Sequence, residues 1–281
     1  MLSRTLSAYL CFAVAAFAGD APKRIVSLSP NVTEMLYGIG AFPDLVGISD
    51  YSTYPPEVKD LPSVGGWHTP NLEKLLALRP GLVIADDGQA NFFQDKIRDL
   101  GFPVLVVPSR TVADIYTAIG ELGRVTGRTE GAERLVTATR DALARVSRRT
   151  AGLRKATVVL IVNRTPGTLR DLYTATDTSF LAELVQVAGG RVVAPKVARG
   201  YDRLSKEDLL AINPDVILDF IHGSESPLAG DPMAAWKEMP ELRAVRNSRV
   251  YGVQEDYVPH ASQRIAETAT RFARLIHPEA K

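Results

Sequence analysis

The chain has 281 residues, 46% of them hydrophobic, and its 33 Lys and Arg nearly balance its 32 Asp and Glu, which leaves a net charge of +1. This length and composition suffice for a large core in one long domain or two lobes, and they exclude a mainly disordered chain. The small net charge gives no reason to expect binding to nucleic acid or to an anionic membrane surface.

The N-terminus has the pattern of a secretory signal peptide over residues 1–18. Arg4 supplies a positive charge, residues 6–17 form an apolar run, and small residues at 16 and 18 indicate cleavage after Ala18. The run is short for a helix that spans a bilayer, and the alternative is a buried first helix. We therefore expect an exported protein, periplasmic if the cell has two membranes.

The only cysteine, Cys11, lies within this segment. We do not expect a lipid anchor there, because Leu10 precedes the cysteine and the apolar run continues past it. The mature protein would then contain no cysteine, which excludes disulfides, a thiol nucleophile and thiolate metal sites. No other stretch reaches the ~18 apolar residues of a membrane helix.

Short apolar runs alternate with amphipathic stretches between residues 24 and 107. This alternation predicts an α/β fold with mainly parallel strands that are covered on both faces. The predicted strands are 24–28, 45–48, 82–85 and 104–107, and the predicted helices are 31–37, 71–78 and 91–100.

Residues 111–150 carry no strand signal and instead predict two helices, 112–125 and 130–149. The second helix has apolar residues at helical spacing, and about 20 helical residues span roughly 30 Å, the width of a small domain. Beyond it the α/β pattern resumes. The further predicted strands are 157–162, 216–218 and 249–253, and the further helices are 179–188 and 261–276.

The second α/β segment repeats part of the first at an offset of 134 residues. Residues 71–80, Asn-Leu-Glu-Lys-Leu-Leu-Ala-Leu-Arg-Pro, align with residues 205–214, Ser-Lys-Glu-Asp-Leu-Leu-Ala-Ile-Asn-Pro. Trp67 falls on Tyr201 at the same offset. A helix–proline–strand unit is common in α/β proteins, so chance similarity is the alternative. We favour related lobes, and the predicted division is an N-terminal lobe 19–125, a connecting helix 126–150 and a C-terminal lobe 151–281.

Common catalytic motifs are missing from the sequence. There is no Gly-x-Ser-x-Gly elbow and no Walker loop, and the four histidines lack the spacing of a helical zinc site. Asp86-Asp87, at the end of a predicted strand, forms either a solvated turn or, in an exported metal-dependent hydrolase, an acid/base or metal pair. We favour a binding protein over an enzyme, with no catalytic residue, no resident cofactor and no metal site.

Several aromatic residues fall in predicted loops at the carboxyl ends of strands, where open α/β sheets bind ligands. Flat aromatic side chains there suit a large, partly apolar, planar ligand, although aromatics in such loops also fill the core. We favour the ligand for Trp67 and Tyr201, because the repeat matches them. The residues in these loops include Tyr51, Tyr54, Trp67, Phe92, Phe93, Tyr201, Tyr257 and His260.

Three segments carry a family resemblance. They are Ile25-Val-Ser-Leu-Ser-Pro-Asn-Val-Thr-Glu-Met-Leu, Gly47-Ile-Ser-Asp-Tyr-Ser-Thr-Tyr-Pro-Pro and Gly66-Trp-His-Thr-Pro-Asn-Leu-Glu. The mature chain resembles the helical-backbone substrate-binding proteins of ABC importers, which serve vitamin B12, ferric siderophores and haem, and it is most similar to the vitamin B12-binding branch. The resemblance implies two Rossmann-like α/β lobes joined by one long α-helix, a ligand cleft between them, and a permease dimer with cytoplasmic ATPases as partner.

Carried over by residue, the resemblance implies that Tyr51, Tyr54 and Trp67 face a corrinoid. The chain departs from the branch elsewhere, since Tyr201 and Tyr257 stand where tryptophans are found and His260 stands near an arginine. These departures leave open vitamin B12, a precursor such as cobinamide, or another chelate, and His260 either ligates a metal or forms a plain hydrogen bond. The candidate ligand-binding residues are Tyr51, Tyr54, Trp67, His68, Asp86, Tyr201, Asp256, Tyr257 and His260.

Glu73 and Glu207 occupy the first turns of the two repeated helices. The helix dipole favours a carboxylate there by about 0.3–1 kcal/mol, which is one explanation for the pair. Matched glutamates also suit two copies of one basic patch on a two-fold partner, and the resemblance implies pairing with permease arginines. We favour docking. The sequence thus predicts a monomeric, periplasmic corrinoid-binding protein, and the alternatives are a siderophore- or haem-binding protein of the same fold and an exported hydrolase.

Overall fold

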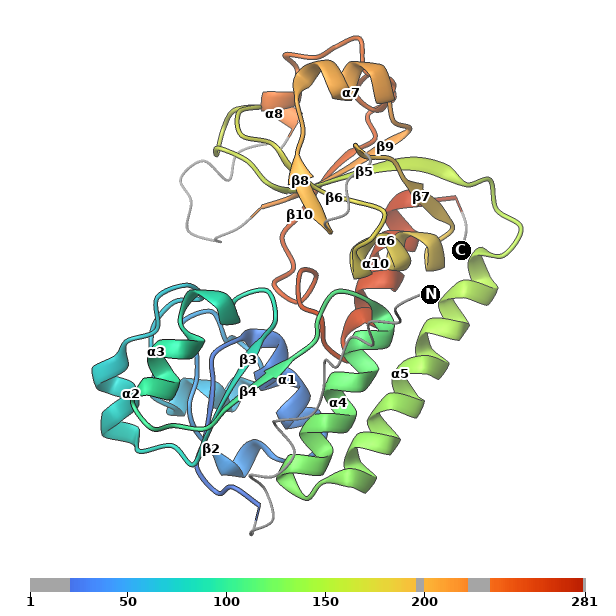
Figure 1. Cartoon of the computed structure of the whole chain (residues 1–281). Coiled ribbons are helices and arrows are strands. Elements are labelled where there is room, and N and C mark those ends of the chain that lie inside the picture. The colour runs from blue at the N-terminus through green and yellow to red at the C-terminus, as the bar shows by residue number, and fades with distance from the viewer. Residues whose placement is uncertain (1–20, 196–199, 222–232, 280–281) are drawn as a thin grey trace, which may run out of the picture.

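The computed structural model describes residues 21–195, 200–221 and 233–279. These residues form two lobes, each built around its own β-sheet, and the long helix α5 (Thr129–Thr150) runs along one side of both (Figure 1). This is the expected α/β arrangement of two lobes joined by one helix. The predicted signal peptide lies outside the described residues, and within them no helix has the length and apolarity to cross a membrane.

The N-terminal lobe contains a parallel sheet with the strand order β2-β1-β3-β4. Its elements are β1 (Ile25–Ser27), α1 (Pro30–Gly38), β2 (Leu45–Gly47), α2 (Leu72–Leu78), β3 (Leu82–Asp86), α3 (Gln94–Asp99) and β4 (Val104–Val107). All four predicted strands are confirmed. The helix predicted at 91–100 is wrong in its first turn, because Ala90–Phe92 forms a 3-10 turn and the buried Phe93 breaks the helix where its ring enters the core.

Two helices follow the first sheet. The helix α4 (Val112–Thr126) ends at Gly127, whose φ of 68° is left-handed, and it packs against α5. The two helices approach so closely that a Cβ atom on Gly123 would lie 2.4 Å from the Cβ of Ala132. The 22 residues of α5 give it a length of roughly 33 Å.

The C-terminal lobe has a mixed sheet with the order β10-β9-β5-β6-β8, and β7 also pairs with β5. The strand β6 runs antiparallel to both of its neighbours, β5 and β8. The short strands β6, β7 and β8 were not predicted from the sequence. The last helix, α10, begins at Ile265, later than predicted, because the residues before it form a turn against the other lobe. The elements are β5 (Ala156–Asn163), β6 (Tyr173–Ala175), α6 (Phe180–Val187), β7 (Gly190–Val192), β8 (Tyr201–Arg203), α7 (Lys206–Ile212), β9 (Val216–Phe220), α8 (Met233–Trp236), α9 (Arg243–Arg246), β10 (Val250–Val253) and α10 (Ile265–Ile276).

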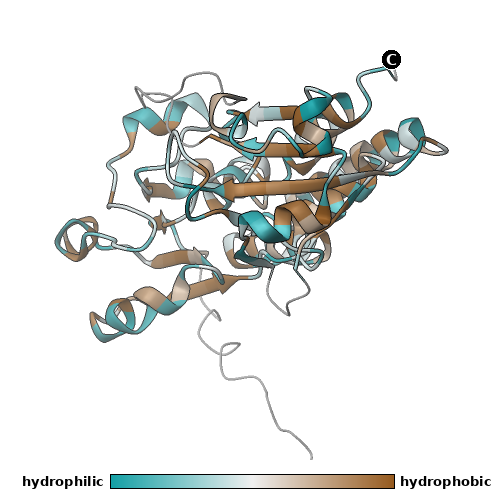
Figure 2. Ribbon diagram, turned by 90° about the horizontal axis from the view of Figure 1, so that it is seen from above, coloured by the Kyte–Doolittle hydropathy of each residue, from teal (hydrophilic) through white to brown (hydrophobic). Residues whose placement is uncertain are grey.

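One apolar core extends through both lobes. It includes Leu36 of α1, Leu122 of α4, Leu143 of α5, Leu160 of β5 and Phe272 of α10. A smaller cluster covers the other face of each sheet. The strands are accordingly hydrophobic along their length, whereas the outer helices carry hydrophilic stretches (Figure 2). The lobe boundaries at residues 125 and 150 stay a prediction.

The repeat is also present in the backbone. The helices α2 and α7 each have seven residues and begin after a side-chain cap, Asn71 in one and Ser205 in the other. Each ends at a left-handed residue, Arg79 with a φ of 45° and Asn213 with a φ of 44°, and each leads into a strand of five buried residues. The match between the lobes therefore includes caps and turn conformation as well as sequence.

Candidate functional site

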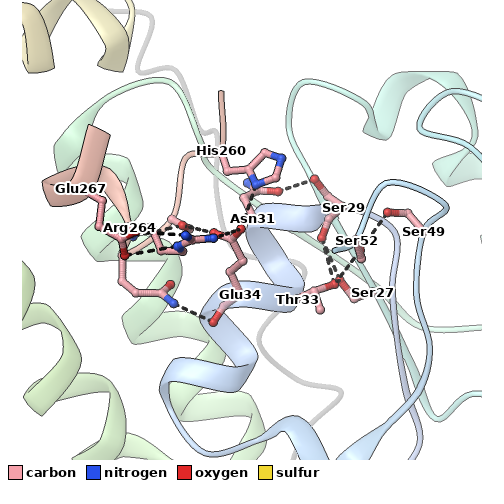
Figure 3. A network of polar contacts seen from close by, with 12 residues as sticks. Ser27, Ser29, Asn31, Thr33, Glu34, Ser49, Ser52, His260, Arg264 and Glu267 are labelled. Carbon is pink, nitrogen blue, oxygen red and sulfur yellow. Dashed lines mark hydrogen bonds and ion pairs between the residues drawn. The ribbon is translucent and has the colours of Figure 1, made fainter. Parts of the chain in front are cut away.

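Buried hydroxyl groups anchor the loop that follows β2. Thr33 Oγ1 donates to Ser27 Oγ at 2.8 Å and lies 3.2 Å from Ser52 Oγ, which is 3.1 Å from Ser49 Oγ (Figure 3). All four side chains are buried. The serine and threonine of the first resemblance segment thus hold the loop that carries the two candidate tyrosines.

Tyr51 and Tyr54 leave this loop in different environments. Tyr51 is 59% exposed, so its ring is free for contact with a ligand. The half-buried Tyr54 packs edge-on against Tyr37, with 5.5 Å between ring centres, and burial raises the pKa of its hydroxyl. Tyr54 is therefore already held by protein contacts.

Arg264 joins Tyr54 to the other lobe. Its guanidinium lies 4.6 Å from the ring centre of Tyr54 and 4.5 Å from that of Tyr257. Its Nη2 atom also pairs with Glu267 at 3.0 Å. The structure thus brings two candidate tyrosines, one from each lobe, onto one cation, while Asp256 is exposed beside them.

Trp67, His68 and Phe92 form a second aromatic group, on the N-terminal lobe. The ring centres of Trp67 and His68 are 4.4 Å apart, and those of His68 and Phe92 are 4.3 Å apart. Phe92 is 53% exposed and His68 is exposed. Trp67 is half-buried against Gly88, where an added Cβ would lie 3.5 Å from its ring. The group is therefore an aromatic surface over the carboxyl end of β3.

Asp86 closes the turn beneath Trp67. Its Oδ2 accepts from Ser29 Oγ at 2.8 Å, and its Oδ1 accepts from two backbone N–H groups of the turn at 2.8 and 3.2 Å. Burial nevertheless raises the pKa of this carboxyl. The pKa of Tyr201 is raised as well, first by burial and then by the charge of Asp86. Trp67 therefore lies over the turn after β3, whereas its counterpart Tyr201, on β8 of the other lobe, packs against the apolar core.

The neighbouring Asp87 has separate partners. Its Oδ1 accepts from Ser109 Oγ at 2.6 Å, and its Oδ2 pairs with Arg110 Nε at 3.1 Å. Among the residues of the described ranges, no group of three or more His, Cys, Asp or Glu side chains is placed to hold a metal ion. Asp86 and Asp87 thus have different hydrogen-bond partners.

Glu34 is a buried carboxylate between the lobes that the sequence analysis did not single out. Its Oε1 atom is 2.8 Å from Nδ1 of His260 and 3.5 Å from Nη1 of Arg264. Its Oε2 atom accepts from Ser262 Oγ, and its backbone oxygen accepts from Gln263 Nε2 at 2.9 Å (Figure 3). The plain hydrogen bond considered for His260 is therefore present, through one of its two ring nitrogens.

Glu73 and Glu207 are exposed on α2 and α7, which lie far apart on the two lobes (Figure 1). Each is followed three residues later by an exposed leucine, Leu76 at 44% and Leu210 at 42%, and residues at this spacing share a helix face. The caps of the two helices are supplied by other residues. Each lobe thus presents the same pair of an exposed carboxylate and an exposed apolar side chain.

A groove of about 490 Å³ runs beside α10. One candidate residue, Tyr257, lines it, together with Ala142 of α5 and the charged residues Glu267 and Arg271. Its lining is thus less aromatic than the surface around Trp67.

Residues 25–257 match the family model described as periplasmic binding protein. The chain belongs to that family. Like its relatives, it is a substrate-binding protein of an ABC importer, and the relatives that match it include vitamin B12-binding proteins. The family resemblance expected from the three sequence segments is therefore confirmed.

Individual relatives cover most of the chain. It is 29% identical over 265 residues to an uncharacterized ABC transporter substrate-binding lipoprotein, YvrC, of Bacillus subtilis, which covers 92% of this chain and 81% of that protein. It is 28% identical over 252 residues to the vitamin B12-binding protein of Pectobacterium carotovorum, with 89% and 87% covered. A periplasmic haem-binding protein from Pseudomonas aeruginosa has the same fold, with a TM-score of 0.81, 23% identity, and 92% of this chain and 94% of that chain covered. These names describe transport binding proteins that act outside the cytoplasm.

Proposed function

We propose that this family member binds a corrinoid, either vitamin B12 or a precursor such as cobinamide, between its lobes and delivers it to a membrane permease. The observation that carries the proposal is the aromatic surface that Trp67, His68 and Phe92 form over the carboxyl end of β3. An exposed aromatic surface suits a large planar ligand, and we expect Tyr201 of the other lobe to face the same ligand. The name of the 28% identical relative supports a corrinoid in particular.

Binding to a panel of coloured ligands tests the proposal. The protein is mixed with cyanocobalamin, cobinamide, haemin or a ferric siderophore, passed through a desalting column, and examined by absorbance. We expect corrinoid to elute with the protein at one equivalent. Retention of haemin or siderophore without corrinoid would instead favour a haem- or siderophore-binding protein of the same fold. The haem-binding protein from Pseudomonas aeruginosa is an example of that fold.

The proposal includes export and docking. Residues 1–18 would act as a signal peptide, and the mature protein would work in the periplasm as a monomer, with no resident cofactor, no metal site and no catalysis. Glu73 and Glu207 would pair with arginines of a two-fold permease dimer whose ATPases lie in the cytoplasm. The matched Glu and Leu pairs on α2 and α7 support this, because a two-fold partner offers two copies of one complementary patch.

A further inference from the structure

One ring nitrogen of His260 is held by a buried carboxylate. A carboxylate can only accept hydrogen bonds, so Nδ1 of His260 carries the proton that is donated to Glu34 over 2.8 Å. In the neutral imidazole, the second ring nitrogen, Nε2, then keeps its lone pair. It has no recorded hydrogen bond within the described part of the chain, and Figure 3 shows it pointing away from Glu34. The side chain is 15% exposed, so the imidazole is not fully enclosed by the protein.

This pairing is the one that prepares a histidine to bind a metal. A carboxylate on the far nitrogen fixes the tautomer and the ring orientation, and it makes the free nitrogen a better donor. Glu34 is well placed for this task, because its side chain is 2% exposed and Ser262 and Arg264 hold it as well.

We propose that Nε2 of His260 is an axial ligand to the metal of a bound tetrapyrrole and that Glu34 is its positioning residue. The inference rests on the proposed function and narrows the class of ligand that the protein would carry. The preferred ligand is a tetrapyrrole whose metal has a water molecule at one axial position, and cobinamide and haem share that chemistry.

The step is a ligand substitution. The lone pair of Nε2 forms a bond to the metal, and the bond from the metal to the axial water breaks, so one water molecule is released. The metal keeps its oxidation state, and the proton on Nδ1 stays in its hydrogen bond to Glu34. In cyanocobalamin both axial positions are already filled, by cyanide and by the molecule's own base, and no substitution is expected.

Visible spectroscopy tests the coordination. The full-length mature protein is titrated with aquocyanocobinamide, cyanocobalamin or haemin, while tryptophan fluorescence reports binding independently. We expect the aquocyanocobinamide spectrum to shift, at one equivalent, to that of its complex with free imidazole, and the cyanocobalamin spectrum to stay unchanged.

A shift with haemin alone would assign the site to haem. Quenching of fluorescence by aquocyanocobinamide and by haemin with neither spectrum shifted would overturn the coordination and leave the proposed function standing. Absence of any quenching would overturn both.

Three variants assign the shift to His260. His260→Ala should abolish the shift and weaken binding at least tenfold, and Glu34→Gln should weaken coordination about tenfold, the lower end of the range for residues that support a metal ligand. His277→Gln, which removes a histidine at the end of α10, should leave the shift intact. If His260→Ala lowers the melting temperature but keeps the shift, the residue only fastens the lobes and the proposal is wrong.

Discussion

Trp67 and Trp236 are the only tryptophans of the chain, and they lie in contrasting environments. Trp236 is fully buried, and its Nε1 atom donates to Asp219 at 2.9 Å. Trp67 is half-buried in the exposed aromatic group with His68 and Phe92. A ligand between the lobes should therefore contact Trp67 directly and leave the surroundings of Trp236 unchanged.

Trp67→Ala should weaken corrinoid binding by roughly 1–3 kcal/mol, the range for burying a large side chain, with little change in melting temperature. Titration followed by ligand absorbance measures the affinity, and Trp236→Phe is the matched control that should keep it. Unchanged binding together with a large drop in melting temperature would show that Trp67 belongs to the core.

Individual contacts between the lobes were beyond sequence reasoning. Glu34 lies in a helix whose residues from Pro30 to Leu36 are all buried, which marks the helix as enclosed without naming its partners. Those partners are His260 and Ser262, more than 220 residues away, and no periodicity links them. Arg264 was missed for another reason: it fell inside the predicted helix 261–276, whereas the observed helix begins at Ile265 and leaves Arg264 in the turn before it.

At the scale of elements, one carboxylate ties three parts of the C-terminal lobe together. Asp215, just before β9, accepts from Thr157 N of β5 at 2.9 Å and from Arg243 Nη1 of α9 at 2.8 Å. Burial works against its charged form, but these hydrogen bonds, one from Thr157 Oγ1 and the charge of Arg154 outweigh burial and lower its pKa to about 2. The free carboxyl group would titrate near 3.8.

This pKa predicts a dependence of stability on pH. Because the folded state lowers the pKa, Asp215 stabilises the protein above about pH 4, and the contribution is lost as the pH falls to about 2. Asp215→Asn should therefore lower the free energy of unfolding by ~2 kcal/mol at pH 7, with a smaller difference at pH 3. Urea unfolding at the two pH values measures it, and Asp99→Asn on the surface should stay within about 0.5 kcal/mol of wild type. An equal loss at both pH values would contradict the assignment.

Elements with an apolar run or a helical period were predictable, and strands that depend on their pairing were not. The strands β1 to β4 and the helices α4 and α5 were predicted to within one residue at each end, because buried apolar runs mark the strands and amphipathic runs mark the helices. The strands β6 and β8 have three residues each and depend on pairing with β5 and with each other, which is a tertiary effect. The similarity of α2 and α7 was predictable because residues 71–80 align directly with residues 205–214.

Charge reversal on α2 and α7 tests docking. Glu73→Lys or Glu207→Lys should each reduce ligand uptake in cells partly, and the double variant severely, while the affinity of the soluble protein stays unchanged. Glu133→Lys, on the exposed side of α5, is the matched control and should not affect uptake. Normal uptake by the double variant would contradict docking. The two glutamates would then contribute only their interaction with the helix dipole, which is worth under about 1 kcal/mol of stability.

At the scale of the whole molecule, the two lobes are not free bodies. The apolar core passes from one sheet through α4, α5 and α10 to the other. The helix α10 packs along α5, and further hydrogen bonds join the lobes at Glu34 and at Val112, whose N–H donates to Glu183 over 3.3 Å. A paired-strand hinge, which would allow a wide closure, is not among the described elements.

Small-angle scattering should therefore give nearly the same radius of gyration with and without cobinamide. A continuous helix resists bending, because each turn is hydrogen-bonded to the next. Marked compaction on binding would contradict this expectation and would place a hinge near Thr126-Gly127, where α4 ends.

The crystal structure of the protein with bound cobinamide tests the central claim most directly. We expect one corrinoid between the lobes, with its plane in contact with Trp67 of one lobe and Tyr201 of the other. A corrinoid in the groove beside α10, or in contact with one lobe only, would contradict it.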